Sequence, residues 1–340
     1  MKNNCLILHQ KKQTKLKMDF QLLFLNLTNP TLLFFVLGII ACLLQSDLEI
    51  PAQTVKFISL YLLFSIGFKG GQELAHGHFT TEIFYSLLFG LAISSLIPFY
   101  TFFILKRKFN VHDAGAVAAA YGSVSAVTFV AATAFLEAQK TTFGGHMVAV
   151  MALMESPAII VGVMLIMRYD TEQTEKGGFA KIMHHAFTNG SVLMIIGSLV
   201  IGLISDAKQA EGIKPFTTDI FKGFLAIFLL EMGMVTAKRF ETFRKYGLFA
   251  VVFAIFAPLV NGSIVACASI LVTENVGNRF MFAVLASSAS YIAVPAAMRL
   301  AAPKADPGLY IPMALGFTFP FNITFGMPIY YTLIKLTTPL

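Results

Sequence analysis

Two serine-rich patches inside long apolar runs contain the residues of this sequence that could do chemistry. The first reads AAYGSVSAVT over residues 119–128 and the second reads SSASYIAVPA over residues 287–296. Hydroxyl groups can bind an anion or a cation, and small residues let two such segments approach closely. We therefore expect the two patches to form a substrate-binding site from Gly122, Ser123, Ser125, Thr128, Ser288, Ser290 and Tyr291.

A helix interrupted near the centre of a bilayer leaves backbone groups that lipid cannot satisfy, so they must face protein or water. The N-terminal end of a half-helix offers N–H donors and partial positive charge to an anion, and a C-terminal end offers carbonyls to a cation. We expect Pro295 to mark the interruption in the second patch. The alternative is that the small residues only form a tight helix contact.

An intramembrane carboxylate is a second candidate. Glu155 lies in VMALMESPAII, two residues before Pro157. A carboxylate is costly at this depth and is a functional candidate by default, either as a cation ligand or as a proton acceptor. The alternative is that it accepts backbone N–H groups freed near Pro157. We assign the coupling ion to Glu155, with Ser287 and Thr318 as further ligands.

The elements that position these residues must lie in a membrane. The chain has 340 residues, of which 56% are hydrophobic and 13% charged, whereas soluble domains carry about 25% charged residues. The net charge of +7 is typical of cytoplasmic loops of a membrane protein. Basic stripes with interleaved aromatic residues are missing, so nucleic-acid binding is not expected. The cysteine and histidine spacings predict no metal site.

Ten apolar runs are long enough to be considered as membrane crossings. They predict an all-α integral membrane protein with two halves of five spans, and an odd number of spans per half gives an inverted repeat. The patches then place broken helices in the fourth and ninth spans. The runs are 31–45, 52–68, 83–105, 114–136, 146–167, 187–205, 219–237, 247–272, 280–301 and 309–334.

The domain organisation follows from these runs and from the loop charges. We expect a basic N-terminal tail at 1–17 (or a misassigned start before Met18), a first repeat at 18–167, a linker at 168–185 and a second repeat at 186–340. An outside N-terminus puts the linker and most loop Lys and Arg in the cytoplasm. Arg279 is counted here with the outer loops.

The chain resembles the sodium-dependent bicarbonate transporter family from Met18 to its C-terminus. The resemblance depends on the order and spacing of MDF, PTLLFFVLG, GFKGGQELA, YGSVSAVT, ESPA, EMGM, SSASYIAVPAAMR and APKADPGLY. It implies sodium-coupled bicarbonate uptake, with both ligands where spans four and nine cross. It also implies a homotrimer in the plasma membrane (the inner membrane of a bacterium), regulation of some members by a PII-like protein, and no cofactor besides the sodium ion.

The two patches also depart from the family pattern. Tyr291 stands where the family has an aspartate, Ala293 and Val294 replace a Ser-Gly pair, and Glu155 replaces an aspartate. A symporter of another small anion, coupled to sodium or protons, and a ligand sensor that does not transport are therefore kept as alternatives. An enzyme is not expected, because HExxH, GxSxG and paired-Asp motifs are missing.

Overall fold

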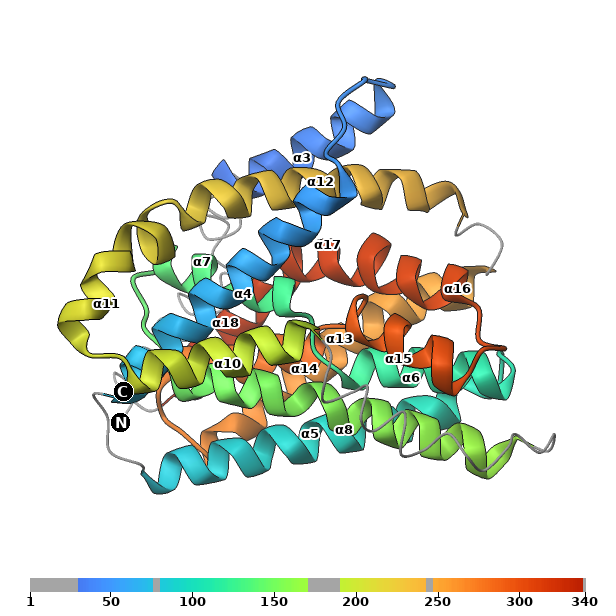
Figure 1. Ribbon diagram of the computed structural model, residues 1–340. Coiled ribbons are helices and arrows are strands. Elements are labelled where there is room, and N and C mark those ends of the chain that lie inside the picture. Colours follow the sequence, from blue (N-terminus) through green and yellow to red (C-terminus); the bar gives the residue numbers. More distant parts are fainter. Residues whose placement is uncertain (1–29, 76–79, 171–189, 243–246, 339–340) are drawn as a thin grey trace, which may run out of the picture.

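The computed structural model describes residues 30–75, 80–170, 190–242 and 247–338, and every regular element within these ranges is helical (Figure 1). The predicted tail at 1–17 and most of the predicted linker lie outside the described residues. Helices form throughout the apolar runs because a buried backbone must satisfy its own N–H and C=O groups. The all-helical fold class predicted from the sequence is thereby confirmed for the part of the chain that the structure describes.

Four helices form one group along one side of the molecule: α3 (Pro30–Leu43), α4 (Ala52–Ala75), α10 (Gly190–Ile204) and α12 (Phe221–Thr242) (Figure 1). We call them the α3–α12 group. Helix α3 packs on α12, and α4 packs on α10. The short helix α11 (Ala207–Lys214) and a π-helical turn at Pro215–Asp219 connect α10 to α12.

Glycines allow the backbones of these pairs to touch. A Cβ on Gly38 of α3 would collide with the carbonyl oxygen of Leu230 in α12, and one on Gly233 would collide with that of Phe35. Helices α4 and α10 meet in the same way through Gly71 and Gly202. Both helix–helix contacts therefore require residues without a side chain.

The remaining helices form a second group that contains both serine-rich patches, and we call it the core group. Helix α5 packs against α6 and α8, and α13 packs against α14 and α18. The members are α5 (Thr81–Leu105), α6 (Val111–Gly122), α7 (Ala126–Ala138), α8 (His146–Tyr169), α13 (Gly247–Ala268), α14 (Val276–Ser287), α15 (Ala293–Ala301), α16 (Pro307–Pro312), α17 (Phe319–Phe321) and α18 (Met327–Thr337).

Both predicted interruptions are present. Helix α6 ends at Gly122 before α7 begins, and α14 ends at Ser287 before α15 begins. The expected position of the second interruption is wrong. The chain leaves the helix at residues 288–292, and Pro295 lies in the first turn of α15. A proline is well tolerated there, because its missing N–H has no partner in a first turn.

The helices that precede the two interruptions, α6 and α14, are alike. Helices α6 and α14 each have 12 residues. Asn110 caps α6 by accepting the Asp113 N–H at 2.8 Å, and Asn275 caps α14 by accepting the Asn278 N–H at 2.9 Å. The asparagine caps fix where each helix starts.

The last apolar run is irregular. Between α16, α17 and α18 the chain forms π-helical turns at Met313–Thr318 and Asn322–Gly326. Prolines at 312, 320 and 328 interrupt the regular hydrogen bonds of this run. Such turns are frequent at functional sites.

Five stretches of the described chain are long and apolar enough to cross a membrane: Thr81–Leu105, Val111–Ala138, His146–Tyr169, Ala207–Lys238 and Gly247–Leu271. Leu96 and Leu248, at 63% and 76% exposed, are suited to contact with lipid rather than water. Each of the ten predicted runs contains a helix, but α3 and α10 are shorter than the approximately 20 residues of a typical crossing. The chain is a multi-pass membrane protein, and the number ten stays a prediction.

One residue counted with the outer loops is misplaced by the sequence analysis. Arg279 lies in α14 and is fully buried. Its guanidinium donates to the Ala266 carbonyl at 2.9 Å and to the hydroxyls of Thr337 and Thr338 at 2.7 and 2.6 Å. It therefore ties α14 to the ends of α13 and α18, and it contributes no loop charge.

Candidate functional site

The two interruptions lie against each other and are joined by two hydrogen bonds. The Ser125 N–H donates to the Ser288 hydroxyl at 3.0 Å, and the Ser290 N–H donates to the Ala120 carbonyl at 2.8 Å. All four residues are buried. The structure thus brings together two segments that are more than 150 residues apart in the sequence, and we call this place the crossing.

Serine hydroxyls accept backbone N–H groups from the first turn of the second helix of each interrupted segment. The Ser125 hydroxyl accepts the Thr128 N–H at 3.2 Å at the start of α7, and the Ser290 hydroxyl accepts the Val294 N–H at 3.4 Å at the start of α15. The positive ends of both helices therefore lie at the crossing. Such helix ends can attract an anion.

The other hydroxyls at the crossing donate to carbonyls. Ser123 donates to the Glu155 carbonyl at 3.2 Å, Ser287 to that of Val284 at 3.0 Å, and Ser288 to that of Leu285 at 2.8 Å. A hydroxyl that donates its proton in this way presents only oxygen lone pairs to a ligand. These oxygens suit a cation better than an anion.

Gly122 has a packing role. A Cβ at this position would lie 2.8 Å from Cγ of Pro98 in α5 and 3.1 Å from Cβ of Ala158 in α8. The end of α6 is thus held between these two helices. A role of Gly122 in binding stays a prediction.

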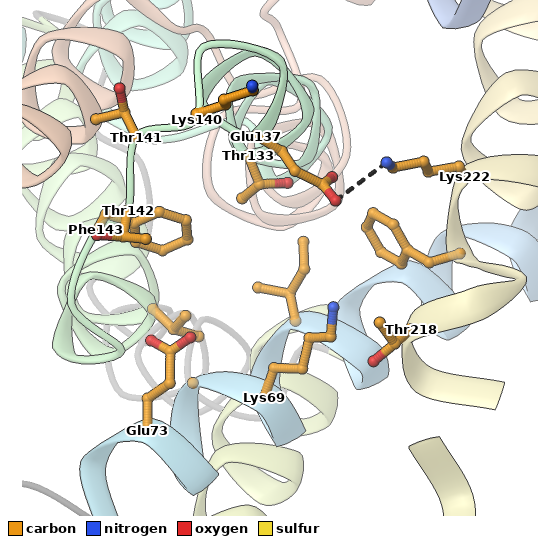
Figure 2. A pocket seen from close by; sticks show the side chains of 14 residues that line it. Lys69, Glu73, Thr133, Glu137, Lys140, Thr141, Thr142, Phe143, Thr218 and Lys222 are labelled. Carbon is orange, nitrogen blue, oxygen red and sulfur yellow. Dashed lines mark ion pairs between the residues drawn. The ribbon is translucent and has the colours of Figure 1, made fainter. Parts of the chain in front are cut away.

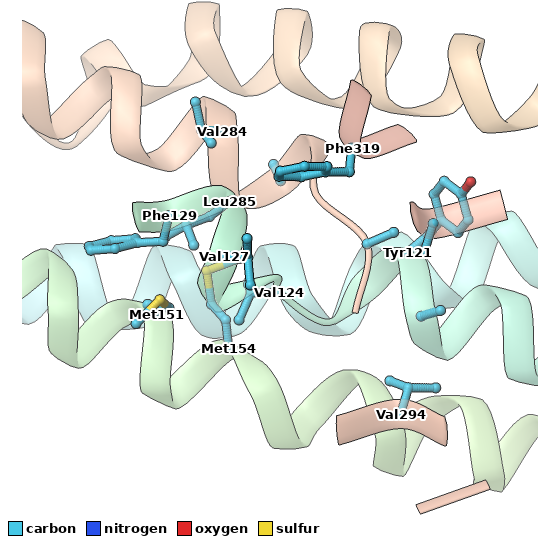
Figure 3. Close-up of a cluster of buried hydrophobic side chains, with 14 of the residues drawn as sticks. Tyr121, Val124, Val127, Phe129, Met151, Met154, Val284, Leu285, Val294 and Phe319 are labelled. Carbon is cyan, nitrogen blue, oxygen red and sulfur yellow. The ribbon is translucent and has the colours of Figure 1, made fainter. Parts of the chain in front are cut away.

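Apolar side chains enclose the crossing (Figure 3). Val124 and Val127 from the first interrupted segment are buried together with Met151 and Met154 of α8, and Phe319 lies nearby. Residues 119–128 are nearly all buried. Polar contacts in such a low-dielectric setting are strong when satisfied and costly when broken.

Thr318 is linked to the crossing by Tyr121, a residue that was not predicted from the sequence. Its hydroxyl lies 2.7 Å from the Tyr121 hydroxyl and donates to the Ala254 carbonyl at 2.7 Å. Tyr121 is fully buried and directly precedes Gly122. The Thr318 oxygen is thereby linked to the end of α6. The sequence signal that could have identified Tyr121 was a tyrosine directly before the serine patch.

Asn322 was also missed. Its amide donates to the Ser287 carbonyl at the end of α14 at 2.8 Å, and its oxygen lies 3.2 Å from the Tyr330 hydroxyl. It is fully buried. An asparagine within the apolar stretch FTFPFNITFG was the signal that could have found it.

Tyr291 connects the crossing to the α3–α12 group. Its hydroxyl lies 4.0 Å from the sulfur of Met232 in α12 and within reach of the Ser125 side chain. Its ring packs edge-on against Phe319, with the ring centroids 6.5 Å apart. The tyrosine therefore covers one side of the crossing.

Glu155 lies on α8, the helix against which both α6 and α15 pack. Its side chain is partly exposed, and its backbone carbonyl accepts the Ser123 hydroxyl. No hydrogen bond or ion pair joins its carboxylate to another described residue. The structure thus places the Glu155 backbone at the crossing, and a role of its carboxylate in binding an ion or a proton stays a prediction.

The described residues contain no group of three or more His, Cys, Asp or Glu side chains that could hold a metal ion.

Residues 30–335 match the Na+-dependent bicarbonate transporter superfamily. No curated protein matches the chain.

Proposed function

The chain belongs to the Na+-dependent bicarbonate transporter superfamily, and we propose that it is a secondary active transporter that couples uptake of a small anion, bicarbonate, to sodium by alternating access. The observation that supports this proposal is the pair of hydrogen bonds between the two interruptions, Ser125 to Ser288 and Ser290 to Ala120. Broken helices that meet inside a membrane protein are typical of transporter sites.

The proposal includes ten membrane-spanning segments arranged as two inverted repeats of five. Helices α6 and α14 have equal lengths and asparagine caps, and each is followed by a helix whose first turn donates a backbone N–H to a preceding serine hydroxyl. The pairing of α3 with α12 and of α10 with α4 also exchanges the first and second helices of the two halves. An inverted repeat produces such reciprocal pairs.

The two ligands would use different groups of the crossing. The anion is proposed to lie at the starts of α7 and α15, where Ser125, Thr128 and Ser290 are found. Sodium is proposed to use the hydroxyl oxygens of Ser287 and Thr318, together with the carboxylate of Glu155. Oxygen ligands are those that hard cations prefer.

Uptake of radiolabelled bicarbonate into proteoliposomes tests the coupling. We expect uptake to rise several-fold above background when an inward sodium gradient is imposed. Uptake that is equal with and without the gradient would refute sodium coupling and favour a proton-coupled symporter. Binding of bicarbonate without any flux would favour a sensor.

Tyr291 in place of a carboxylate is the observation that favours a different small anion as second candidate. A tyrosine side chain adds apolar surface next to the starts of α7 and α15, where a carboxylate would add negative charge. Competition of unlabelled acetate with labelled bicarbonate distinguishes the two substrates. A lower inhibition constant for acetate than for bicarbonate would make bicarbonate the lesser substrate.

Glu155→Gln tests the ion site. The amide is nearly isosteric but carries no charge, so we expect sodium-driven uptake to fall to background while the protein keeps its melting temperature. Glu274→Gln removes a carboxylate from an exposed position away from the crossing and should leave uptake unchanged. Full sodium-driven uptake by Glu155→Gln would remove this residue from the ion site.

The wider setting is also part of the proposal. We propose that the protein is a homotrimer in the plasma membrane, with a PII-like protein as a regulator. Chemical cross-linking in native membranes tests the trimer, and a cross-linked ladder that ends at a dimer contradicts it.

A further inference from the structure

A cavity with several charged residues in its lining lies at one end of the seam between the two helix groups (Figure 2). It has a volume of about 360 Å³ and is lined by α4 and the start of α12 on one side and by α7 and the loop before α8 on the other. The lining includes three lysines and two glutamates: Lys69, Lys140, Lys222, Glu73 and Glu137. The lining therefore has an excess of positive charge.

Helix α7 links this cavity to the crossing. Ser125 caps the start of α7, and Thr133, eight residues further along, lines the cavity. Eight residues of α-helix span about 12 Å. With the outside N-terminus predicted from the loop charges, the cavity opens on the outer face.

The charges in the cavity are only partly neutralised by each other. Lys222 of α12 pairs with Glu137 of α7 at 3.0 Å, and both side chains are 62% exposed. Lys69 points into the cavity toward this pair (Figure 2) and interacts electrostatically with Glu137 and Glu73. An exposed ion pair is weak, so an entering anion can replace the Glu137 carboxylate beside Lys222 and Lys69.

We propose that this cavity is an anion-collecting vestibule, in which Lys69 and Lys222 hold a small carboxylate or bicarbonate ion before it reaches the crossing. The inference rests on the proposed function for the destination of the ion, but the binding itself can be tested without transport. The volume exceeds that of a small anion several-fold, so the ion keeps part of its hydration shell and exchanges rapidly. Thr142, which is exposed and lines the same space, is a hydroxyl available to it.

The ion pair between α7 and α12 also lets anion binding in the vestibule affect how the two helix groups are held together. The Glu137–Lys222 pair connects the core group to the α3–α12 group. An anion that takes over Lys222 releases this connection. Relative movement of two such groups is the usual basis of alternating access.

Transport kinetics test the vestibule in the full chain. For Lys69→Gln, the concentration of bicarbonate at half-maximal uptake should rise roughly three- to tenfold, as expected for the loss of one charge a few ångströms away. The maximal rate should stay within about twofold. Lys69→Arg keeps the charge and should restore the wild-type value, which a purely structural role of Lys69 would not predict. High salt should reduce the difference between variant and wild type.

Lys335→Gln is the matched control. Lys335 is an exposed lysine of α18 that lines neither this cavity nor the neighbouring pocket that Lys69 shares with α11, so its removal should change the half-maximal concentration much less. An unchanged half-maximal concentration in Lys69→Gln, with an active wild type, overturns the proposal. An equal effect of Lys335→Gln also overturns it, because the charge would then act only at long range.

A thiol reaction tests the same cavity independently of transport. Thr142→Cys is introduced into a protein without other cysteines (Cys5→Ser, Cys42→Ser and Cys267→Ser). In detergent, sulfonatoethyl methanethiosulfonate should label it faster than trimethylammonioethyl methanethiosulfonate, after correction for their rates with a free thiol.

The preference should be roughly fivefold, and Lys69→Gln should abolish most of it. Bicarbonate should slow the labelling. Equal labelling by both reagents, or faster labelling by the cationic one, refutes the vestibule even if bicarbonate transport is demonstrated. A clear anionic preference without any bicarbonate flux would support the vestibule and count against the proposed function instead.

Discussion

Removal of a single hydroxyl, in Ser288→Ala, should weaken the crossing measurably. The Ser288 hydroxyl accepts the Ser125 N–H at 3.0 Å and donates to the Leu285 carbonyl at 2.8 Å. Ser125 and Ser288 are 4% and 1% exposed, so water has little access to a freed N–H. The substitution leaves a buried donor without its partner at the start of α7.

The expected cost follows from that donor. A buried unsatisfied polar group costs about 1–3 kcal/mol, whereas hydrogen bonds between membrane helices average about 0.6 kcal/mol and reach about 1.7. We therefore expect Ser288→Ala to lower the free energy of unfolding by about 1–2 kcal/mol. Reversible unfolding of the full chain in mixed micelles, with increasing dodecyl sulfate, measures this change.

A second buried serine provides a matched control. Ser94 of α5 is also fully buried, but its hydroxyl donates to the Leu91 carbonyl of its own helix. Ser94→Ala leaves that carbonyl in its helix and should cost less than about 0.5 kcal/mol. Equal losses in the two variants would show that the bond between Ser125 and Ser288 does not stabilise the crossing. Faster hydrogen exchange at the Ser125 amide in Ser288→Ala alone would support it.

Two further substitutions test how the helices are held together. Gly38→Ala should destabilise the protein by about 1–3 kcal/mol, because the new methyl group meets the Leu230 carbonyl. Gly223 of α12 lies in open space, so Gly223→Ala should be neutral or slightly stabilising. Equal melting temperatures of the two variants would contradict the close contact between α3 and α12. Arg279→Lys should cost about 2 kcal/mol, since an ammonium group cannot reproduce the guanidinium bonds to Ala266 and Thr337; a wild-type unfolding curve would show that this network is dispensable.

The sequence predicted the helices and the two interruptions well, for a physical reason. Apolar runs must be helical inside a membrane, and serine and glycine clusters within such runs are costly unless they face protein. Both interruptions therefore lie in the patches at 119–128 and 287–296. The error at Pro295 arises because a proline starts a helix as readily as it ends one.

The contacts between distant segments could not be predicted from the sequence. That Ser125 bonds to Ser288 rather than to a closer residue depends on how the two halves are placed, which no local pattern encodes. The same is true of Asn322 and of the burial of Arg279. The vestibule was missed because its lysines come from α4, α12 and the loop after α7, and each resembles an ordinary loop charge.

The interlocked pairing of the two halves has a consequence for synthesis of the protein in the cell. Gly38 of α3 meets Leu230 of α12 only after 192 further residues have been made, which takes on the order of ten to forty seconds at ribosomal speed. Gln72 of α4 likewise has to wait for the carbonyls of Gly202 and Ser205, to which it donates in the finished fold. During that interval the glycine surface of α3 lies in the bilayer without the helix that covers it in the finished fold. Packing of the first half is therefore completed only after the second half has been made.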